Sequence, residues 1–302
     1  MTIAITGGTG FVGQALIDLA ERRKVALRSL ARSVPKDRRG VDWVEGDLGN
    51  RDALRRLLAQ AEAVIHIAGQ VRATDPAEFE QANVAGTLNV VEAAIDAGVS
   101  RFVFVSSLAA REPQLSAYGA SKLRAERIVK ASGLDWTIVR PPAIYGPRDR
   151  EMLDLFEMAR LRVVPMPKRG SASIVHVGDL VRLLLELHEG GEGVTSQMFE
   201  PDDGRPGGWE HRALAKAIGA AVGTNPLVPR LPAPVMRLAA WMDSLLRRGD
   251  AKLTPDRVGY MMHPDWVSDP ARRPPEALWR PVIPTPEGLA ATALWYRRNE
   301  WL

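Results

Sequence analysis

The chain has 302 residues, and its 40 Lys and Arg exceed its 36 Asp and Glu by four charges. Apolar residues make up 46% and charged residues 25%, which is typical of a globular protein and excludes a disordered or fibrous chain. There is no Cys, so disulfide scaffolds and Cys nucleophiles are excluded. No apolar run is long enough to span a membrane, and no dense basic stripe indicates nucleic-acid binding. We therefore expect a soluble, cytoplasmic protein that binds neither membrane nor nucleic acid.

Short apolar runs alternate with helical patterns through the first half of the chain. The six expected strands are Ile3–Thr6, Val25–Ala31, Val41–Glu45, Ala63–Ile67, Phe102–Ser106 and Trp136–Arg140. The expected helices are Phe11–Arg22, Pro76–Ala97 and Ala117–Ala131. Because the strand runs are apolar throughout rather than alternating, they predict a buried parallel sheet with helices on both faces. The predicted fold class is therefore α/β, with a doubly wound parallel sheet.

A glycine-rich turn, Thr6-Gly7-Gly8-Thr9-Gly10-Phe11-Val12-Gly13, joins the first strand to the first helix. Gly7 permits the tight turn, Gly10 allows the backbone to approach a pyrophosphate, and Gly13 allows close packing of the helix on the sheet. The N–H groups of the helix N-terminus then face the anion. This strand–turn–helix context predicts a Rossmann dinucleotide site.

The end of the second strand indicates which dinucleotide is bound. NAD-binding chains usually carry an acidic residue there, whereas NADP-binding chains carry arginine. The sequence reads Leu30-Ala31-Arg32-Ser33, so we expect NADP(H) rather than NAD(H), with Arg32 on the 2′-phosphate and Ser33 or Arg28 assisting. Asp47 follows the third strand, where it is placed to contact the adenine ring or to cap a turn.

A phenol and an amine lie four residues apart in Tyr118-Gly119-Ala120-Ser121-Lys122, on one face of an expected helix. An ammonium beside a phenol favours the phenolate, so Tyr118 can exchange a proton near neutral pH while hydride moves. Ser106 and Ser107 end the fifth strand, where a hydroxyl can hold a substrate oxygen. The five histidines show no ligand-like pairing, so no metal is expected.

The composition changes in the last third of the chain. Positions 201–302 contain 14 of the 22 prolines and six of the eight tryptophans, so we expect shorter helices and loops there. We assign residues 1–146 to an NADP-binding Rossmann domain, to which 174–190 return. Residues 147–173 and 191–302 are assigned to a smaller substrate-binding lobe.

Taken in order, these motifs resemble those of the extended short-chain dehydrogenase/reductase family, which includes nucleotide-sugar epimerases and dehydratases. The similar segments run along nearly the whole chain. They are the glycine turn at 6–13, GDL at 46–48, HIAG at 66–69, NVAGT at 83–87, the serine pair at 106–107, YGASK at 118–122, RPPAIYGP at 140–147, HVGDL at 176–180 and ALWRP at 277–281.

The resemblance implies a role for each matching residue. Tyr118 would be the catalytic acid/base, and Lys122 would hold the nicotinamide ribose and lower the pKa of the tyrosine. Ser107 would bind substrate, and Asn83 would support the active site from its helix. The family usually forms homodimers through the helices near Asn83 and Tyr118. The residues implied for the cofactor are Gly7, Gly10, Phe11, Val12, Gly13, Arg32, Asp47, Leu48, Ala68, Gly69, Tyr118, Lys122, Pro141 and Ile144.

One departure from the family bears on the substrate. Many nucleotide-sugar members carry an arginine before the late HV motif that clamps the substrate diphosphate, and this chain has Ala172 there. Lys168, Arg169 and Arg148 are nearby cations that could rebuild an anion site. The leading interpretation is an NADP(H)-dependent oxidoreductase acting on an apolar carbonyl compound or secondary alcohol. The alternatives are a nucleotide-sugar epimerase or dehydratase, and a non-catalytic NADP-binding accessory or regulatory protein.

Overall fold

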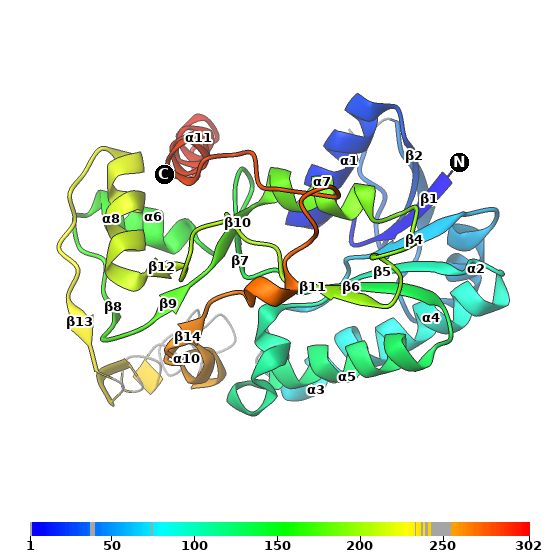
Figure 1. Ribbon diagram of the computed structural model, residues 1–302, viewed down its shortest axis with the longest axis horizontal. Helices are drawn as coiled ribbons and strands as arrows, with labels where there is room; N and C mark the ends of the chain where they lie inside the picture. Colours follow the sequence, from blue (N-terminus) through cyan, green and yellow to red (C-terminus); the bar gives the residue numbers. More distant parts are fainter. Residues whose placement is uncertain are drawn as a thin grey trace. The chain divides into compact units, whose positions relative to one another are not determined.

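The computed structural model describes residues 2–36, 40–73, 75–232, 234–236, 238, 241–242 and 255–302. Seven parallel strands form its main sheet, in the order β11-β6-β5-β4-β1-β2-β3 (Figure 1). The strands are β1 (Thr2–Thr6), β2 (Ala26–Ala31), β3 (Asp42–Glu45), β4 (Ala63–His66), β5 (Arg101–Val105), β6 (Asp135–Val139) and β11 (Gln197–Phe199). The first six agree with the predicted strands to within one residue at each end, and the doubly wound α/β fold is confirmed.

The strand order reverses between β1 and β4, where the register pairs Thr6 with His66. In doubly wound sheets, ligands bind beyond the carboxyl ends of the strands at such a switch point. The glycine turn follows β1 and the HIAG segment begins at the end of β4, so both lie at this position.

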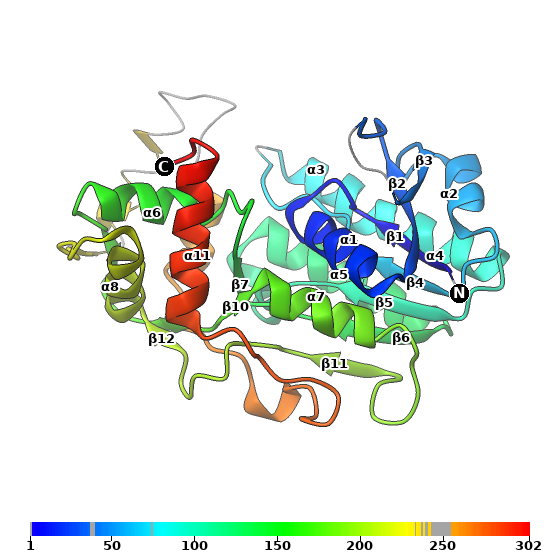
Figure 2. The same cartoon turned by 90° about the horizontal axis from the view of Figure 1, so that it is seen from above.

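Helices cover both faces of the sheet. One face carries α1 (Phe11–Arg23), with α7 (Val177–Glu186) beside it, and the ion pair between Arg23 and Glu186 joins them at 2.5 Å (Figure 2). On the other face, α2 (Arg51–Leu58), α4 (Gly86–Asp96) and α5 (Ala117–Ala131) pack against the strands in one apolar cluster. The fully buried residues of this cluster include Ala4, Leu54, Leu57, Val64, Val90, Phe102, Phe104, Ala125 and Ile138.

The predicted long helix at 76–97 is divided into three segments. It begins as α3 (Pro76–Phe79), continues as the π-helical turn η1 (Glu80–Ala85) and ends as α4. Asp75 starts it with a capping box, in which Glu78 reaches back to the Asp75 backbone. The π-helical turn contains Asn83, one of the residues assigned to the active site.

The chain forms two compact units. The first contains Met1–Pro141, Leu180–Glu200 and Pro274–Trp279, and the second contains Pro142–Asp179, Pro201–Arg273 and Arg280–Leu302. This division differs from the expected domains. Residues 191–200 belong to the first unit because β11 pairs with β6 as the edge strand of the main sheet. Residues 142–146 and 174–179 belong to the second unit, where β7 (Ala143–Tyr145) pairs with β10 (Ile174–His176).

The second unit has a core of its own, built on α6 (Leu153–Arg160), α8 (His211–Val222) and α11 (Thr285–Arg298). Its other elements are short: β8 (Met166–Pro167), β9 (Ser171–Ala172), β12 (Trp209–Glu210), β13 (Arg230–Leu231), α10 (Pro255–Met261) and β14 (Asp265–Trp266). The helices α8 and α11 have 12 and 14 residues, against 13 and 15 for α1 and α5, so the expectation of shorter helices after residue 200 does not hold for these two. Proline is tolerated in the first turn of a helix, which is where α11 carries it.

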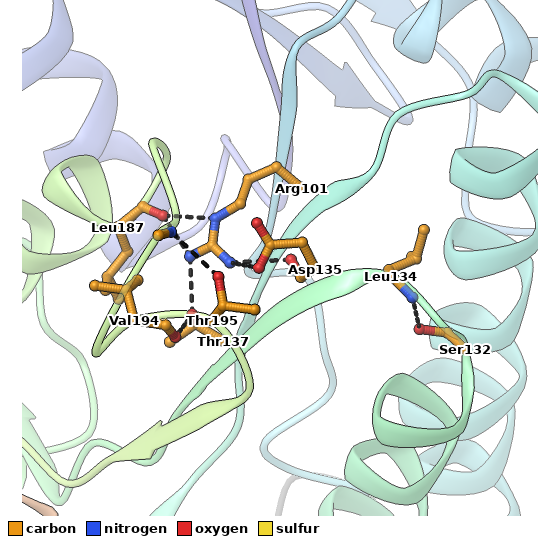
Figure 3. A network of polar contacts seen from close by, with 9 residues as sticks. Arg101, Ser132, Leu134, Asp135, Thr137, Leu187, Val194 and Thr195 are labelled. Carbon is orange, nitrogen blue, oxygen red and sulfur yellow. Dashed lines mark hydrogen bonds and ion pairs between the residues drawn. The ribbon is translucent and has the colours of Figure 1, made fainter.

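A buried guanidinium joins the amino ends of β5 and β6 to the end of α7 (Figure 3). Arg101 is 4% exposed and donates to the carbonyl oxygen of Leu187, to the carboxylate and carbonyl of Asp135, and to the hydroxyl of Thr137. Thr137 in turn donates to the carbonyl of Val194 at 2.6 Å. This cluster, which we call the Arg101 cluster, lies at the opposite end of β5 from Ser106 and Ser107.

Replacing Arg101 with Met is expected to lower the free energy of unfolding by about 3 kcal/mol or more. The substitution leaves the buried oxygens that accept from the guanidinium without a hydrogen-bond donor. Urea denaturation, followed by circular dichroism, measures this. A loss below about 1 kcal/mol would show that water or rearrangement replaces the guanidinium.

Candidate active site

The glycine turn leaves no room for side chains on its inner surface. Gly7 has φ +76°, and a Cβ there would lie 2.7 Å from the backbone nitrogen of Ala68. A Cβ on Gly13 would overlap the carbonyl oxygen of Gly7, and one on Gly8 would overlap the hydroxyl of Ser29. The chain is therefore folded tightly from β1 into α1, with backbone rather than side chains at the surface of the turn.

The first turn of α1 has no side-chain cap in the described structure, and its N-cap is Gly10. By contrast, the side chains of Asn50 and Ser116 cap α2 and α5. Uncapped N–H groups at the start of a helix attract an anion, which they hold together with the helix dipole. The turn, including the predicted residues Phe11 and Val12, thus fits the pyrophosphate of a dinucleotide.

The residues predicted to select the dinucleotide lie beyond the ends of β2 and β3. Arg32 is exposed directly after β2, and the carbonyl of Ala31 accepts a hydrogen bond from Gly46, which holds the two strand ends together. Asp47 is exposed, and its Oδ1 accepts from the N–H of Gly49 at 2.8 Å, as in an Asx turn. Leu48 is half-buried against the apolar cluster beneath the sheet.

Arg28 does not lie with Arg32. Its guanidinium donates to the carboxylate of Asp42 at 2.5 Å and to the carbonyl of Ala59 at 2.6 Å. Asp42 begins β3, whereas Arg32 follows the carboxyl end of β2. Arg28 therefore braces β2, β3 and the end of α2, and its predicted assistance at the 2′-phosphate is corrected.

The start of α5 lies close to the segment that follows β5. Ser116 caps α5 by accepting from the N–H of Gly119, and a Cβ on Gly119 would lie 2.5 Å from the carbonyl oxygen of Ala109. Ser107 caps the 3₁₀ turn η2 (Leu108–Arg111) by accepting from the N–H of Ala109. The absence of a side chain at Gly119 thus brings the helix turn that carries Tyr118 against the turn that Ser107 begins.

Lys122 extends from α5 to the end of β5. Its Nζ donates to the carbonyl of Val105 at 2.8 Å and lies 4.6 Å from the centre of the Phe104 ring. The side chain is buried, and burial lowers the pKa of Lys122 to about 8, while the carboxylate of Glu126 opposes this by raising it. Tyr118, one helical turn earlier, is half-buried with its ring packed on Phe79 at 5.8 Å between centroids.

Asn83 joins the loop after β4 to α5. Its Oδ1 accepts from the N–H of Gln70 at 2.7 Å, and its Nδ2 donates to the Gln70 carbonyl and to the hydroxyl of Ser121. A Cβ on Gly69 would lie 2.9 Å from Asn83 Oδ1 and 3.5 Å from Lys122 Nζ. The structure therefore brings Gly69, Asn83 and Lys122 together, and Asn83 lies in a π-helical turn, a feature frequent at functional sites.

Sequence reasoning did not assign a role to His66, which is completely buried at the end of β4. Its Nδ1 lies 2.6 Å from the hydroxyl of Thr6, and its Nε2 lies 3.0 Å from the hydroxyl of Thr87. Thr6 accepts from the N–H of Ala68, and Thr87 donates to the carbonyl of Asn83. A neutral imidazole with its proton on Nε2 satisfies all four hydrogen bonds.

Burial, with a smaller contribution from the charge of Lys122, lowers the pKa of His66 to about 3. His66 therefore stays neutral at physiological pH, and it links β1, the Ala68 loop and Asn83 instead of transferring protons. A histidine that ends a fully apolar strand was the available sequence signal.

Two predicted residues lie further along the chain. The carbonyl of Pro141 accepts from the N–H of Leu108 at 3.0 Å, so Pro141 contacts the turn that follows Ser107. Ile144 lies in β7 of the second unit, where it pairs with Val175 of β10.

The cations considered for a diphosphate site all lie in the second unit. Lys168 and Arg169 are exposed before β9, the strand that contains Ala172. The neighbouring Arg150 has its guanidinium over the Trp301 ring at 4.9 Å.

The described ranges contain no group of three or more His, Asp or Glu side chains that could hold a metal ion. Within them, none of the helices combines the length and apolar character that crossing a bilayer requires.

The sequence matches the NAD dependent epimerase/dehydratase family over residues 3–199. It is 35% identical to the ceramide reductase of Caulobacter vibrioides, in an alignment that covers 99% of this chain and 96% of the relative. It is 31% identical to the 4-hydroxy-2-methyl-3-oxo-4-farnesyl-3,4-dihydroquinoline-1-oxide ketoreductase of Stigmatella aurantiaca, over 80% of this chain and 86% of the relative.

Among solved structures, the UDP-glucose 4-epimerase of Thermotoga maritima superposes with a TM-score of 0.73 at 23% identity, covering 99% of this chain and all of the epimerase. This similarity shows the fold. The family match over most of the chain, together with the two reductase relatives, shows that the chain belongs to the NAD dependent epimerase/dehydratase family, the extended short-chain dehydrogenases/reductases, whose members are oxidoreductases and epimerases.

Proposed function

We propose that the chain is an NADP(H)-dependent reductase of a ketone attached to a long apolar chain, and that it also oxidises the corresponding secondary alcohol. The observation that carries the catalytic part is the arrangement of Lys122. Its ammonium is buried one helical turn from Tyr118, is held by the carbonyl of Val105, and adjoins Asn83 and Gly69. A buried amine with a lowered pKa, one helical turn from a phenol, is suited to proton exchange near neutral pH.

The chemistry requires one proton and one hydride for each ketone. NADPH, when bound, supplies the hydride to the carbonyl carbon. Tyr118 donates its phenolic proton to the carbonyl oxygen, so that the C=O bond becomes a secondary alcohol and the phenol becomes a phenolate. The Lys122 ammonium stabilises that phenolate, and the Ser107 hydroxyl donates a hydrogen bond that orients the substrate oxygen.

The substrate class rests on two observations. Both reductase relatives are named for substrates with an extended apolar part, a ceramide and a farnesyl-substituted 3-oxo compound. In addition, the family resemblance places Ala172 at the position where many nucleotide-sugar members carry a diphosphate-binding arginine. Burying a diphosphate without paired cations is costly, so this position disfavours a nucleotide sugar.

NADPH oxidation assays with a matched set of 3-oxo lipids and short soluble ketones test the proposal. We expect kcat/KM to rise with the length of the apolar chain, because each buried methylene contributes about 0.8 kcal/mol. Calorimetry with UDP, GDP and dTDP on the NADP-loaded protein tests the epimerase alternative. Low-micromolar binding of any of them, lost in Arg148→Ala or Arg169→Ala, would replace the lipid-ketone assignment with a nucleotide-sugar substrate.

The choice of NADP over NAD depends on Arg32. Arg32→Ala is expected to weaken NADPH binding by about 1.5–3 kcal/mol, the contribution of charge-assisted hydrogen bonds, while NADH binding changes far less. Fluorescence titration of both cofactors measures the difference, and Arg55→Ala, at an exposed position on α2, is the matched control. Equal affinities of the unmutated protein for NADPH and NADH would contradict the assignment.

A further inference from the structure

Three consecutive residues at the end of β5 are each held by a different contact. The carbonyl of Val105 accepts from Lys122 Nζ at 2.8 Å. The hydroxyl of Ser106 donates to Glu126 Oε1 at 2.5 Å. Ser107, the predicted substrate-binding serine, follows directly and caps η2. The position of the Val105 carbonyl and of the Ser107 backbone is therefore coupled to the contact between Ser106 and Glu126.

Glu126 is completely buried on α5, four residues after Lys122 and eight after Tyr118, so the three side chains share one face of the helix. Arg140, which follows β6, pairs with it in bidentate geometry: Nε donates to Oε1 at 2.7 Å and Nη2 donates to Oε2 at 2.6 Å. Arg140 Nη1 also lies 3.8 Å from Oε1 of the buried Glu200.

Such a pair is not required for stability alone. Replacing a buried ion pair by apolar residues of similar size is often neutral or stabilising, because the desolvation of two charges offsets their attraction. A role in positioning therefore explains the pair better than a role in folding does. The Arg101 cluster, at the other end of β5 and β6, is a natural comparison, since its guanidinium is also buried but lies at the opposite end of β5 from Ser106 and Ser107.

We propose that Glu126 is a positioning residue for the Tyr118–Lys122 pair. Through Ser106 it fixes the end of β5, which holds the Lys122 ammonium, and its negative charge helps to keep that ammonium protonated. The charged or titratable groups around Lys122 are Glu126 itself, Tyr118 on the same helix, the neutral His66 of β4, and Arg140 with Glu200 behind Glu126. The proposal rests on the proposed function, because it assigns Glu126 a role toward that pair.

The charge is tested with Glu126→Gln, which keeps an oxygen acceptor for Ser106. Removing a negative charge lowers the pKa of every neighbouring group, so the Tyr118–Lys122 pair loses its first proton at lower pH. We expect the basic limb of the kcat profile for ketone reduction to move down by about one pH unit. Glu126→Asp keeps the charge but has a shorter reach. We expect its basic limb to lie at the pH found for the unmutated protein, while its kcat is lower than that of the unmutated protein.

The hydrogen bond is tested with Ser106→Ala, which leaves the Glu126–Arg140 pair in place. We expect kcat to fall between about tenfold and a hundredfold, as for a small displacement of reacting groups, with an unchanged pH profile and little change in Tm. Thr137→Val, in the Arg101 cluster, is the control. It is expected to lower Tm while kcat and the pH profile stay unchanged.

A merely structural role predicts a different pattern. If Glu126→Gln and Ser106→Ala lowered Tm but left the pH profile and kcat as in Thr137→Val, the proposal would be overturned. If Glu126→Gln did not fold, Ser106→Ala and Glu126→Asp would still decide it. A separate measurement tests the proposed function itself: full activity of a variant that lacks the Tyr118 hydroxyl would contradict it.

Discussion

Tyr118→Phe is expected to reduce kcat by at least a factor of about one hundred, while NADPH binds nearly as it does to the unmutated protein. The substitution removes only the hydroxyl that exchanges a proton with the substrate oxygen. The ring still packs on Phe79, and α5 keeps its cap at Ser116. The loss therefore falls on the chemical step rather than on folding or cofactor affinity.

Steady-state rates with a ketone substrate, together with fluorescence titration of NADPH, measure the two effects separately. Retention of more than about a tenth of kcat would contradict the acid/base assignment, since general acid–base groups contribute about 10²–10⁴-fold. A parallel loss of NADPH affinity would show that the hydroxyl contributes to binding.

Lys122→Met is expected to abolish turnover and at the same time to stabilise the protein without cofactor at pH 7. The pKa of Lys122 is about 8 in the folded chain, against an ordinary value of 10.5. A pKa difference of one corresponds to about 1.4 kcal/mol, so the difference between the two pKa values of Lys122 means that the charged ammonium destabilises the folded state by roughly 3 kcal/mol. Met fills a similar volume against Phe104. It leaves the Val105 carbonyl without a donor, however, and this destabilises the variant by about 1–2 kcal/mol.

The sign of this effect changes with pH in a defined window. Below about pH 8 both folded and unfolded chains hold the proton, so the unmutated protein bears the full cost. Between about 8 and 10.5 the unfolded chain binds more protons, so the stability of the unmutated protein rises with pH. The advantage of Met should therefore vanish within this window, and the unmutated protein should be the more stable of the two near its upper end.

Urea denaturation of both proteins at several pH values between 7 and 10 measures this difference. A stability difference that does not depend on pH would show that Lys122 holds its proton equally well in the folded and unfolded chains, so that burial does not lower its pKa. NADPH affinity should fall as well, because the ammonium is assigned to the nicotinamide ribose.

The central sheet was predictable because its strands are short, apolar and separated by clear turns. The edge strand β11 was not predicted, since Gln197–Phe199 has only three residues and its pairing with β6 is set by tertiary contact. The helix α2 was also missed, although Asn50 caps it and its buried residues Leu54, Leu57 and Leu58 follow helical spacing. That signal was present in the sequence.

The candidate site was predictable where chemistry depends on local spacing, as in the glycine turn and the Tyr118–Lys122 pair. Contacts between distant residues were not. The Glu126–Arg140 pair joins residues 14 apart, and the contact between Thr6 and His66 joins residues 60 apart. Nothing in a single sequence shows that two such buried polar residues meet, because their pairing depends on the packing of β1 against β4 and of α5 against β6.

Because Asn83 lies in a π-helical turn, its contacts depend on the number of residues in this helix as well as on their identity. A π turn accommodates one residue more than an α turn, and each residue of an α-helix adds about 100° of rotation. Deleting one residue before Asn83 would restore regular α-helical geometry and swing its amide away from Gln70 and Ser121. Lineages that vary by insertion or deletion would thus lose this connection even with every side chain retained, so the segment between Pro76 and Gly86 is constrained in length.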